Sequence, residues 1–163
     1  MKTQPQDKST QNEVHITHIF DADRKLVFDA WTDPKQLEKW YAPDGCTISF
    51  STIDVREGGQ FHSCIYNPEH GNCWCKGTYL EITAPEKIVF TMQVTNENGN
   101  DVNPIDMGMD ADWPAVTQVT LLFEDLNGKT RLTLLQTVSE SLAKTTGAHP
   151  SWIQMFNRLN EML

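Results

Sequence analysis

Three cysteines and two histidines gather around one turn signal in the middle of the chain. They are His62, Cys64, His70, Cys73 and Cys75. Thiolate and imidazole together suit zinc, which structural sites hold through four such ligands. Side chains at i and i+2 share a strand face, so His62 pairs with Cys64, and Cys73 pairs with Cys75. These residue types predict a zinc site if the two pairs face each other.

Hairpin register decides whether the two pairs meet. A shift by one residue moves every side chain of a strand to the other face, and the turn at residues 67–71 does not fix the register. The spacing of Cys73 and Cys75 is also tighter than the gap of about two to four residues in most zinc sites. Small buried thiols are therefore the preferred interpretation, and we expect no metal or other cofactor.

Acid–base residues that could serve an enzyme are also present. The candidates are His18, His62, Glu81 and His149. Their spacing does not bring together a nucleophile, its base and an orienting group. Gly58 and Gly59 lack the further glycines, the lysine and the following helix of a phosphate-binding loop. A cyclase or hydrolase that uses His62 or Glu81 as acid–base is therefore the alternative function.

Composition narrows the class of partner. The chain has 163 residues, 39% of them hydrophobic, and a net charge of −9. Nucleic acid is not an expected partner, because Lys and Arg are needed to displace phosphate counterions. No apolar run approaches the ~20 residues of a membrane span, and no signal segment opens the chain. We expect a cytoplasmic monomer or homodimer, with a loose tail at residues 1–12 and one domain at residues 13–163.

The first third of the chain predicts one strand and two short helices. Residues 14–20 alternate and are rich in β-branched side chains, as in a strand. Asp21 or Asp23 then caps a helix. Asp33 and Pro34 start a second helix by the same kind of signal.

Residues 46–136 predict strands joined by turns. Glycines at 58, 59, 71 and 128 mark turns between the alternating segments, and strands this close in sequence pair antiparallel as a meander. The longest irregular stretch is residues 96–114, which carries Met107, Met109 and Trp113. A loop of this length is either a lid or an inert excursion.

The chain ends in helices. Ser139 caps a short helix, Gly147 interrupts it, and Pro150 lies in the first turn of a final helix. The apolar stripe of that helix consists of Trp152, Met155, Phe156, Leu159, Met162 and Leu163. Arg158 and Glu161 fall on the outer side. The stripe must be buried, and the apolar face of the sheet is the available surface.

This order of elements is that of the α+β helix-grip fold, a curved antiparallel sheet of about seven strands closed by a C-terminal helix. Several stretches resemble the family homologous to the activator of the heat-shock chaperone ATPase, within the START-like or SRPBCC superfamily. They are residues 20–34 (FDADRKLVFDAWTDP), 40–43 (WYAP), 56–61 (REGGQF), 77–81 (GTYLE), 130–134 (TRLTL) and 147–159. The chain departs from the family at Tyr41, where a second Trp is common, and at Asp23, where Pro is common.

The resemblance implies a scaffold for a small-molecule ligand. The eukaryotic activator carries a further N-terminal domain that this chain lacks, so we do not carry over its chaperone-activating role in the stress response. A chaperone-associated protein-binding module is a further alternative, and it predicts a large exposed apolar patch instead of a pocket.

The leading hypothesis is the binding of a small hydrophobic or amphipathic molecule in a cavity between the sheet and the final helix. A straight helix cannot follow a strongly curved sheet everywhere, so a space remains unless large side chains fill it. The predicted lining is Phe50, Tyr66, Met92, Val119, Leu134, Trp152, Met155, Phe156 and Leu159, with Trp31, Trp40 and Trp113 nearer the mouth. Taken singly, each of these residues suits a solid core better, but taken as a group they favour a cavity.

Overall fold

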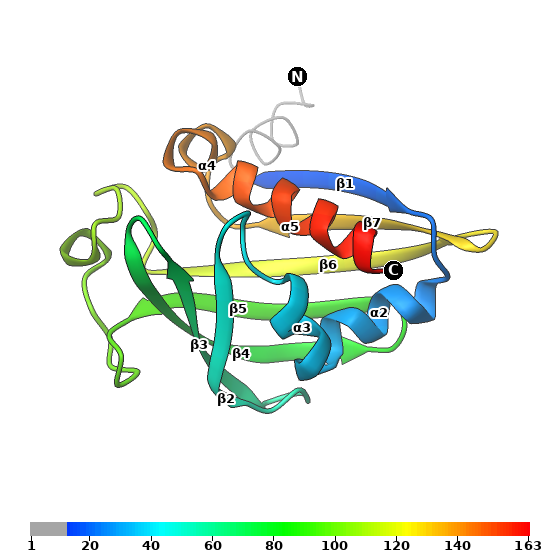
Figure 1. The fold of residues 1–163 in the computed structure, drawn as a ribbon, viewed down its shortest axis with the longest axis horizontal. Coiled ribbons are helices and arrows are strands. Elements are labelled where there is room, and N and C mark those ends of the chain that lie inside the picture. Colours follow the sequence, from blue (N-terminus) through cyan, green and yellow to red (C-terminus); the bar gives the residue numbers. More distant parts are fainter. Residues whose placement is uncertain (1–12) are drawn as a thin grey trace, which may run out of the picture.

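The computed structural model describes residues 13–163 as one antiparallel sheet with helices on one face (Figure 1). The tail expected at residues 1–12 lies outside the described residues. In chain order the elements are β1 Val14–Phe20, α2 Arg24–Thr32, α3 Pro34–Trp40, β2 Thr47–Ile53, β3 Gln60–Asn67, β4 Gly71–Thr83, β5 Lys87–Thr95, the 3-10 helix η1 Pro104–Met107, β6 Val116–Leu126, β7 Lys129–Gln136, α4 Glu140–Thr146 and α5 Ala148–Met162.

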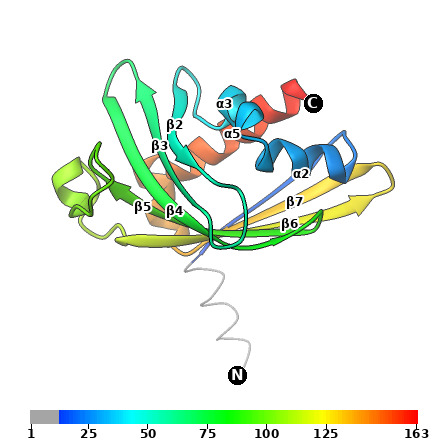
Figure 2. The ribbon, with the colours of Figure 1, turned by 90° about the horizontal axis from the view of Figure 1, so that it is seen from below.

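The seven strands lie in the order β1-β7-β6-β5-β4-β3-β2. Strands β2 to β7 therefore form a meander, and β1 adds to its end beside β7. Figure 2 shows the sheet bent into a trough that holds α2, α3 and α5. Bulges between Phe50 and Thr52 in β2, and between Tyr79 and Glu81 in β4, add to the bend. The predicted helix-grip fold is confirmed.

The predicted helix starts act through their side chains. Asp23 caps α2, where its carboxylate accepts a hydrogen bond from the Lys25 backbone N–H at 3.4 Å. Asp33 caps α3 by accepting one from the Lys35 backbone N–H at 3.0 Å, with Pro34 as the first helical residue. Each cap satisfies a backbone N–H that has no partner within the helix. Together they place α2 and α3 one after the other over the concave face.

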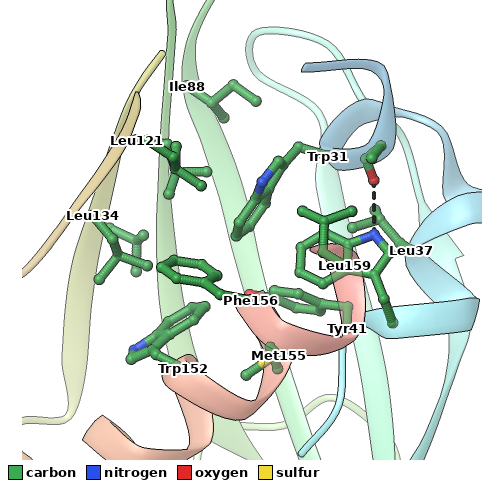
Figure 3. Packing of buried hydrophobic residues seen from close by; sticks show 14 of the residues in the cluster. Trp31, Leu37, Tyr41, Ile88, Leu121, Leu134, Trp152, Met155, Phe156 and Leu159 are labelled. Atoms are coloured by element: carbon green, nitrogen blue, oxygen red, sulfur yellow. Dashed lines mark hydrogen bonds between the residues drawn. The ribbon is translucent and has the colours of Figure 1, made fainter. Parts of the chain in front are cut away.

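Side chains fill the space beneath α5. In Figure 3, Trp152, Phe156 and Leu159 point from α5 toward the sheet. Phe156 and Leu159 have no exposed surface, and neither do Leu121 and Leu134 on the strands below them. The cavity expected between the last helix and the sheet is therefore not where the sequence placed it. Large side chains close the gap that sheet curvature would otherwise leave.

Arg158 corrects the expectation for the outer side of α5. Its guanidinium is partly buried and donates hydrogen bonds to the backbone carbonyls of Lys39, Ala42, Pro43 and Cys46. A side chain with five donors in a planar fork suits such a cluster of carbonyls. Arg158 thus ties α5 to the connection between α3 and β2.

Candidate functional site

A small void lies between the α2–α3 pair and the half of the sheet formed by β2 to β5. Its lining residues are Trp31, Leu37, Tyr41, Phe50, Phe61, Tyr79, Ile88 and Phe90. Figure 3 shows Trp31 between Ile88 on the sheet and Leu37 on α3. The volume of the void is about 20 Å³. That volume holds about one water molecule. We call this space the inner void.

Three residues in the lining of the inner void carry polar groups, namely Trp31, Tyr41 and Tyr79. Trp31 is 3% exposed, and its Nε1–H has no hydrogen-bond partner among residues 13–163. Burial raises the pKa of Tyr79 to about 12. Burial also raises the pKa of Tyr41 well above its ordinary value, and the nearby Cys75 and Tyr79 contribute to this shift. Both tyrosines are therefore neutral phenols near pH 7.

One aromatic wall of the inner void depends on a glycine. The rings of Phe61, Tyr79 and Phe90 have centroids 5.8 to 6.0 Å apart. A Cβ on Gly77 would lie 2.6 Å from the Phe61 ring and 1.8 Å from the Thr91 carbonyl oxygen. Only glycine leaves room for both neighbours at this point of β4.

A larger groove is lined by residues of the β3–β4 hairpin, the first turn of α5 and the loop after β5. Figure 1 shows these three segments at the same end of the sheet. The groove consists of two adjoining parts of about 320 Å³ and 130 Å³. Four residues line both parts, namely Ile65, Cys73, Val94 and Met109. Met107, Trp113 and Met92 complete much of its apolar surface. We call it the sulfur groove.

Sulfur atoms are concentrated in this groove. Three of the four cysteines and three of the six methionines line it, namely Cys46, Cys73, Cys75, Met92, Met107 and Met109. Burial raises the pKa of Cys75 to about 12, so this thiol is neutral and behaves as a small apolar group. Methionine side chains are flexible and polarisable, so they can repack around guests of different shape.

A buried hydrogen-bond chain forms part of the groove's floor. The Trp152 Nε1–H donates to Gln136 Oε1 at 2.9 Å, and Gln136 Nε2 donates to Thr117 Oγ1 at 3.1 Å. Gln136 and Thr117 line the smaller part of the groove and are each 2% exposed. These buried polar groups are satisfied within the protein, so the chain fixes the floor rigidly.

The structure divides the predicted lining residues among four environments. Met92 and Trp113 line the sulfur groove, and Trp31 and Phe50 line the inner void. Tyr66 on β3 is 51% exposed and lines neither hollow. The others belong to the packed core, namely Trp40, Val119, Leu134, Trp152, Met155, Phe156 and Leu159.

Sequence reasoning missed several residues that shape the two hollows. They are Tyr41, Phe61, Tyr79, Phe90, Ile65 and Val94. Most of them alternate along β3, β4 and β5, so the period-2 pattern could have placed them on one face. The pattern gives no indication of which inward positions border empty space.

The residues of the zinc hypothesis lie on both faces of the sheet. Cys64 is opposite Trp74, and Ile65 is opposite Cys73. Because side chains alternate, Cys64 and His62 point to one face, whereas Cys73 and Cys75 point to the other. Within residues 13–163, no group of three or more His, Cys, Asp or Glu side chains could hold a metal ion.

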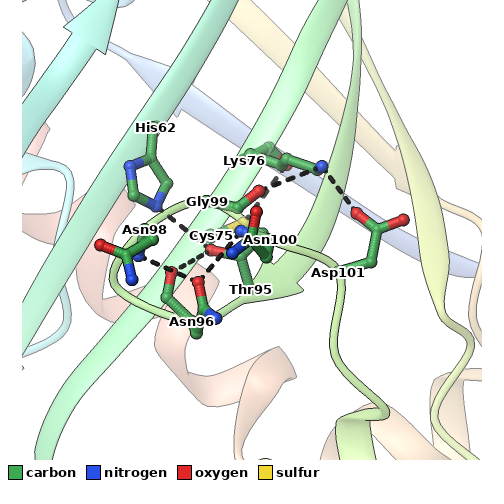
Figure 4. A network of polar contacts seen from close by, with 9 residues as sticks. All are labelled: His62, Cys75, Lys76, Thr95, Asn96, Asn98, Gly99, Asn100 and Asp101. Atoms are coloured by element: carbon green, nitrogen blue, oxygen red, sulfur yellow. Dashed lines mark hydrogen bonds and ion pairs between the residues drawn. The ribbon is translucent and has the colours of Figure 1, made fainter.

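His62 stabilises the outer face of the sheet. Its Nδ1 lies 2.7 Å from Ser51 Oγ, its Nε2 lies 3.2 Å from Thr95 Oγ1, and its ring stacks on Trp74. Figure 4 shows the loop after β5 folded against it. Lys76 holds the same loop through an ion pair with Asp101 at 2.6 Å. These contacts anchor the start of the loop that continues to Met107 and Met109.

The other acid–base candidates also lie outside both hollows. Glu81 pairs with Lys87 at 3.4 Å, and His149 lies 3.7 Å from Glu140. His18 packs against Phe20 and Phe156, and burial lowers its pKa. None of the three lines the inner void or the sulfur groove.

Comparison with family models matches residues 21–163 to the Activator of Hsp90 ATPase homolog 1-like proteins. The chain belongs to this family. The family lies within the START-like superfamily, and its fold is consistent with a ligand-binding domain. A comparison with curated proteins gives no match. No helix among the described residues is long and apolar enough to span a bilayer.

Solved structures of low sequence identity share the family's fold. A protein from Arthrobacter aurescens is 25% identical with a TM-score of 0.79, over 93% of this chain and 86% of that one. Protein CV1439 from Chromobacterium violaceum is 21% identical with a TM-score of 0.75, over 93% and 96%. CalU16 from Micromonospora echinospora is 20% identical with a TM-score of 0.59, over 91% and 74%.

Proposed function

We propose that this protein binds a small hydrophobic or amphipathic molecule, and that the sulfur groove takes the apolar body of that molecule. The observation that carries the proposal is the groove itself, about 320 Å³ and 130 Å³ in its two parts. Ligand sites in proteins are hollows of this kind, mostly apolar with a few polar groups. Membership of a START-like family supports the same role.

The lining favours a neutral ligand. No Lys, Arg, Asp or Glu among the described residues lines either part of the groove. Apart from His70, the lining within residues 13–163 has no ionisable side chain other than thiols, so a charged group placed there would lose its hydration without a Lys, Arg, Asp or Glu to offset it. The polar residues that do line it include Asn67, Asn72, Gln93 and Ser151, which can orient a hydroxyl or carbonyl group.

The loop after β5 supplies the movable wall of the groove. Met107 and Met109 lie on its irregular part, and Met107 is 40% exposed before any ligand is bound. Exposed methionines beside a hollow can close over a guest and lose that exposure. This supports the lid interpretation of the loop.

Filling the groove tests the proposal. Cys73 is exposed and lines both parts, so Cys73→Phe adds a ring to the groove without entering the core. We expect the Kd of the neutral fluorescent probe N-phenyl-1-naphthylamine to rise about 10-fold or more in a fluorescence titration. This corresponds to the loss of about 1.4 kcal/mol of binding free energy.

Thr17→Phe provides the matched control. Thr17 is an exposed strand residue on β1 and lines neither part of the groove. We expect this variant to bind the probe as the wild type does. Equal affinity in all three proteins, or no binding by the wild type, would contradict the proposal.

A further inference from the structure

The inner void lacks a hydrogen-bond partner for a buried donor. Trp31 is 3% exposed, and its Nε1–H has no partner among residues 13–163. An indole nitrogen can only donate. A buried donor left unsatisfied costs about 1 to 3 kcal/mol. The void beside it holds about one water-sized group. The missing partner is therefore an acceptor atom of that size.

Two tyrosines border the same void. Tyr41 is 9% exposed and Tyr79 is 6% exposed, so both residues are more than nine-tenths buried. With Trp31, they place three side chains that each carry a donor in the lining of one small space. An acceptor oxygen with two lone pairs can accept hydrogen bonds from two of them.

The charge of the lining restricts this acceptor to a neutral group. No Lys, Arg, Asp or Glu of the described chain lines the void, and the remaining residues are apolar. A buried carboxylate or phosphate would have no cation to offset its lost hydration. A cation would meet the positive end of the indole N–H. A carbonyl oxygen accepts the available bonds and carries no net charge.

The inner void lies beside the sulfur groove. Cys75 lines the groove, and its thiol is close enough to Tyr41 to contribute to the raised pKa of that phenol. The Tyr41 ring is also 6.0 Å from that of Trp152, whose N–H belongs to the groove floor. Tyr41, which lines the void, and Cys75, which lines the groove, therefore lie next to each other where the two hollows come closest.

We propose that the inner void is a subsite for the neutral carbonyl oxygen of the ligand, which receives hydrogen bonds from Trp31 Nε1–H and from the Tyr41 or Tyr79 hydroxyl. In the free protein one water molecule takes this place. The inference rests on the proposed function and deepens it, because it assigns a ketone, ester, amide or quinone group to the molecule that the sulfur groove binds.

A pair of isosteric probes tests the subsite. 2-Acetylnaphthalene and 2-isopropenylnaphthalene have the same shape, but the second carries a methylene group in place of the carbonyl oxygen. Both compete with N-phenyl-1-naphthylamine in a fluorescence titration of the full chain. We expect the ketone to bind about 10-fold more tightly. In ¹⁵N-labelled protein, the assigned Trp31 Nε1–H signal should shift downfield with the ketone only.

Tyrosine variants provide the second measurement. Tyr41→Phe and Tyr79→Phe remove the hydroxyls and keep the rings, so both should fold. We expect at least one of them to lower the preference for the ketone about 3-fold or more. Tyr66→Phe is the matched control, because Tyr66 is half exposed and lies outside the void. This variant should keep the full preference.

The outcomes separate the two proposals. Equal affinity for the two naphthalenes, or a preference that both Tyr41→Phe and Tyr79→Phe leave intact, overturns the carbonyl subsite. If Cys73→Phe still raises the Kd of N-phenyl-1-naphthylamine about 10-fold or more, the proposed function stands and only the carbonyl subsite fails. If the wild type binds none of the three compounds, both proposals fail.

Discussion

Three tryptophans of the core are almost fully buried, but within residues 13–163 only two of their indole N–H groups have partners. Trp40 donates to the Ala30 carbonyl at 3.1 Å, and Trp152 donates to Gln136 at 2.9 Å. Trp31 has no such partner, although it is as buried as Trp152, each being 3% exposed. Burial alone therefore does not distinguish Trp31 from the other two tryptophans, whereas hydrogen-bond satisfaction does.

Removing the Arg158 side chain should destabilise the protein. The Arg158 guanidinium donates to four backbone carbonyls between Lys39 and Cys46. Arg158→Ala leaves these carbonyls without their donor, and hydrogen bonds to charged groups contribute about 1.5 to 3 kcal/mol. We expect the free energy of unfolding in urea to fall by about 2 kcal/mol.

Arg131→Ala is the control for the loss of an arginine. Arg131 makes one exposed ion pair with Glu124 at 3.3 Å. Such pairs contribute about 0 to 1 kcal/mol, so this variant should unfold close to the wild type. If Arg158→Ala is no less stable than Arg131→Ala, the guanidinium does not hold the α3–β2 connection.

At the scale of elements, the local signals in the sequence were reliable. The caps at Asp23 and Asp33 and the break at Gly147 lie where their residue types predict them. These features depend on neighbours within a few residues, so a single sequence contains them. The pairing of β3 with β4 depends on the register across a turn. That register separates Cys64 from Cys73, and no residue of the turn specifies it.

Strand β4 has no room for a side chain at Gly77. Gly77 faces Phe61 across the β3–β4 pair, and a methyl group there would overlap the Phe61 ring and the Thr91 carbonyl oxygen. Because the second clash is with backbone, rotation of a side chain cannot relieve it. Overpacking of this kind costs about 1 to 3 kcal/mol. Gly77→Ala should therefore lower the urea midpoint with little change in the m-value.

The same substitution should also disturb the inner void. The displaced Phe61 ring forms a wall with Tyr79 and Phe90, so the environment of these rings changes. Near-UV circular dichroism measures this directly. A Gly77→Ala protein with wild-type stability and an unchanged aromatic spectrum would show that the strand accommodates a methyl group without strain.

At the scale of the whole molecule, the sequence predicted which faces are apolar but not where space is left over. Phe156 and Leu159 fill the trough beneath α5, whereas Gly77 and Cys75 leave β4 with less side-chain volume. Whether a hollow remains depends on the sum of many side-chain volumes against the curvature of the sheet. That balance is a property of the assembled fold, so the predicted lining residues lie in the core, the void, the groove and, for Tyr66, at the exposed surface.

The loop after β5 contributes to the wall of the sulfur groove but not to the hydrophobic core. We therefore expect binding, and not folding, to depend on it. None of the residues of η1 is buried, so replacing Pro104–Met107 with a Gly/Ser segment of equal length should change the unfolding free energy by no more than about 1 kcal/mol. It removes Met107 from the groove wall, so the Kd for N-phenyl-1-naphthylamine should rise about 3-fold or more.

Met107→Leu and Met109→Leu together test whether bulk or sulfur matters at this wall. Leucine keeps the apolar volume, so the double variant should stay within about 2-fold of the wild-type Kd, because volume-conserving swaps are tolerated best.

A Gly/Ser loop variant that binds the probe as tightly as the wild type would show that the loop is an inert excursion. A variant that fails to fold would show instead that the loop is part of the fold, because the strands and α5 would then need it to remain assembled.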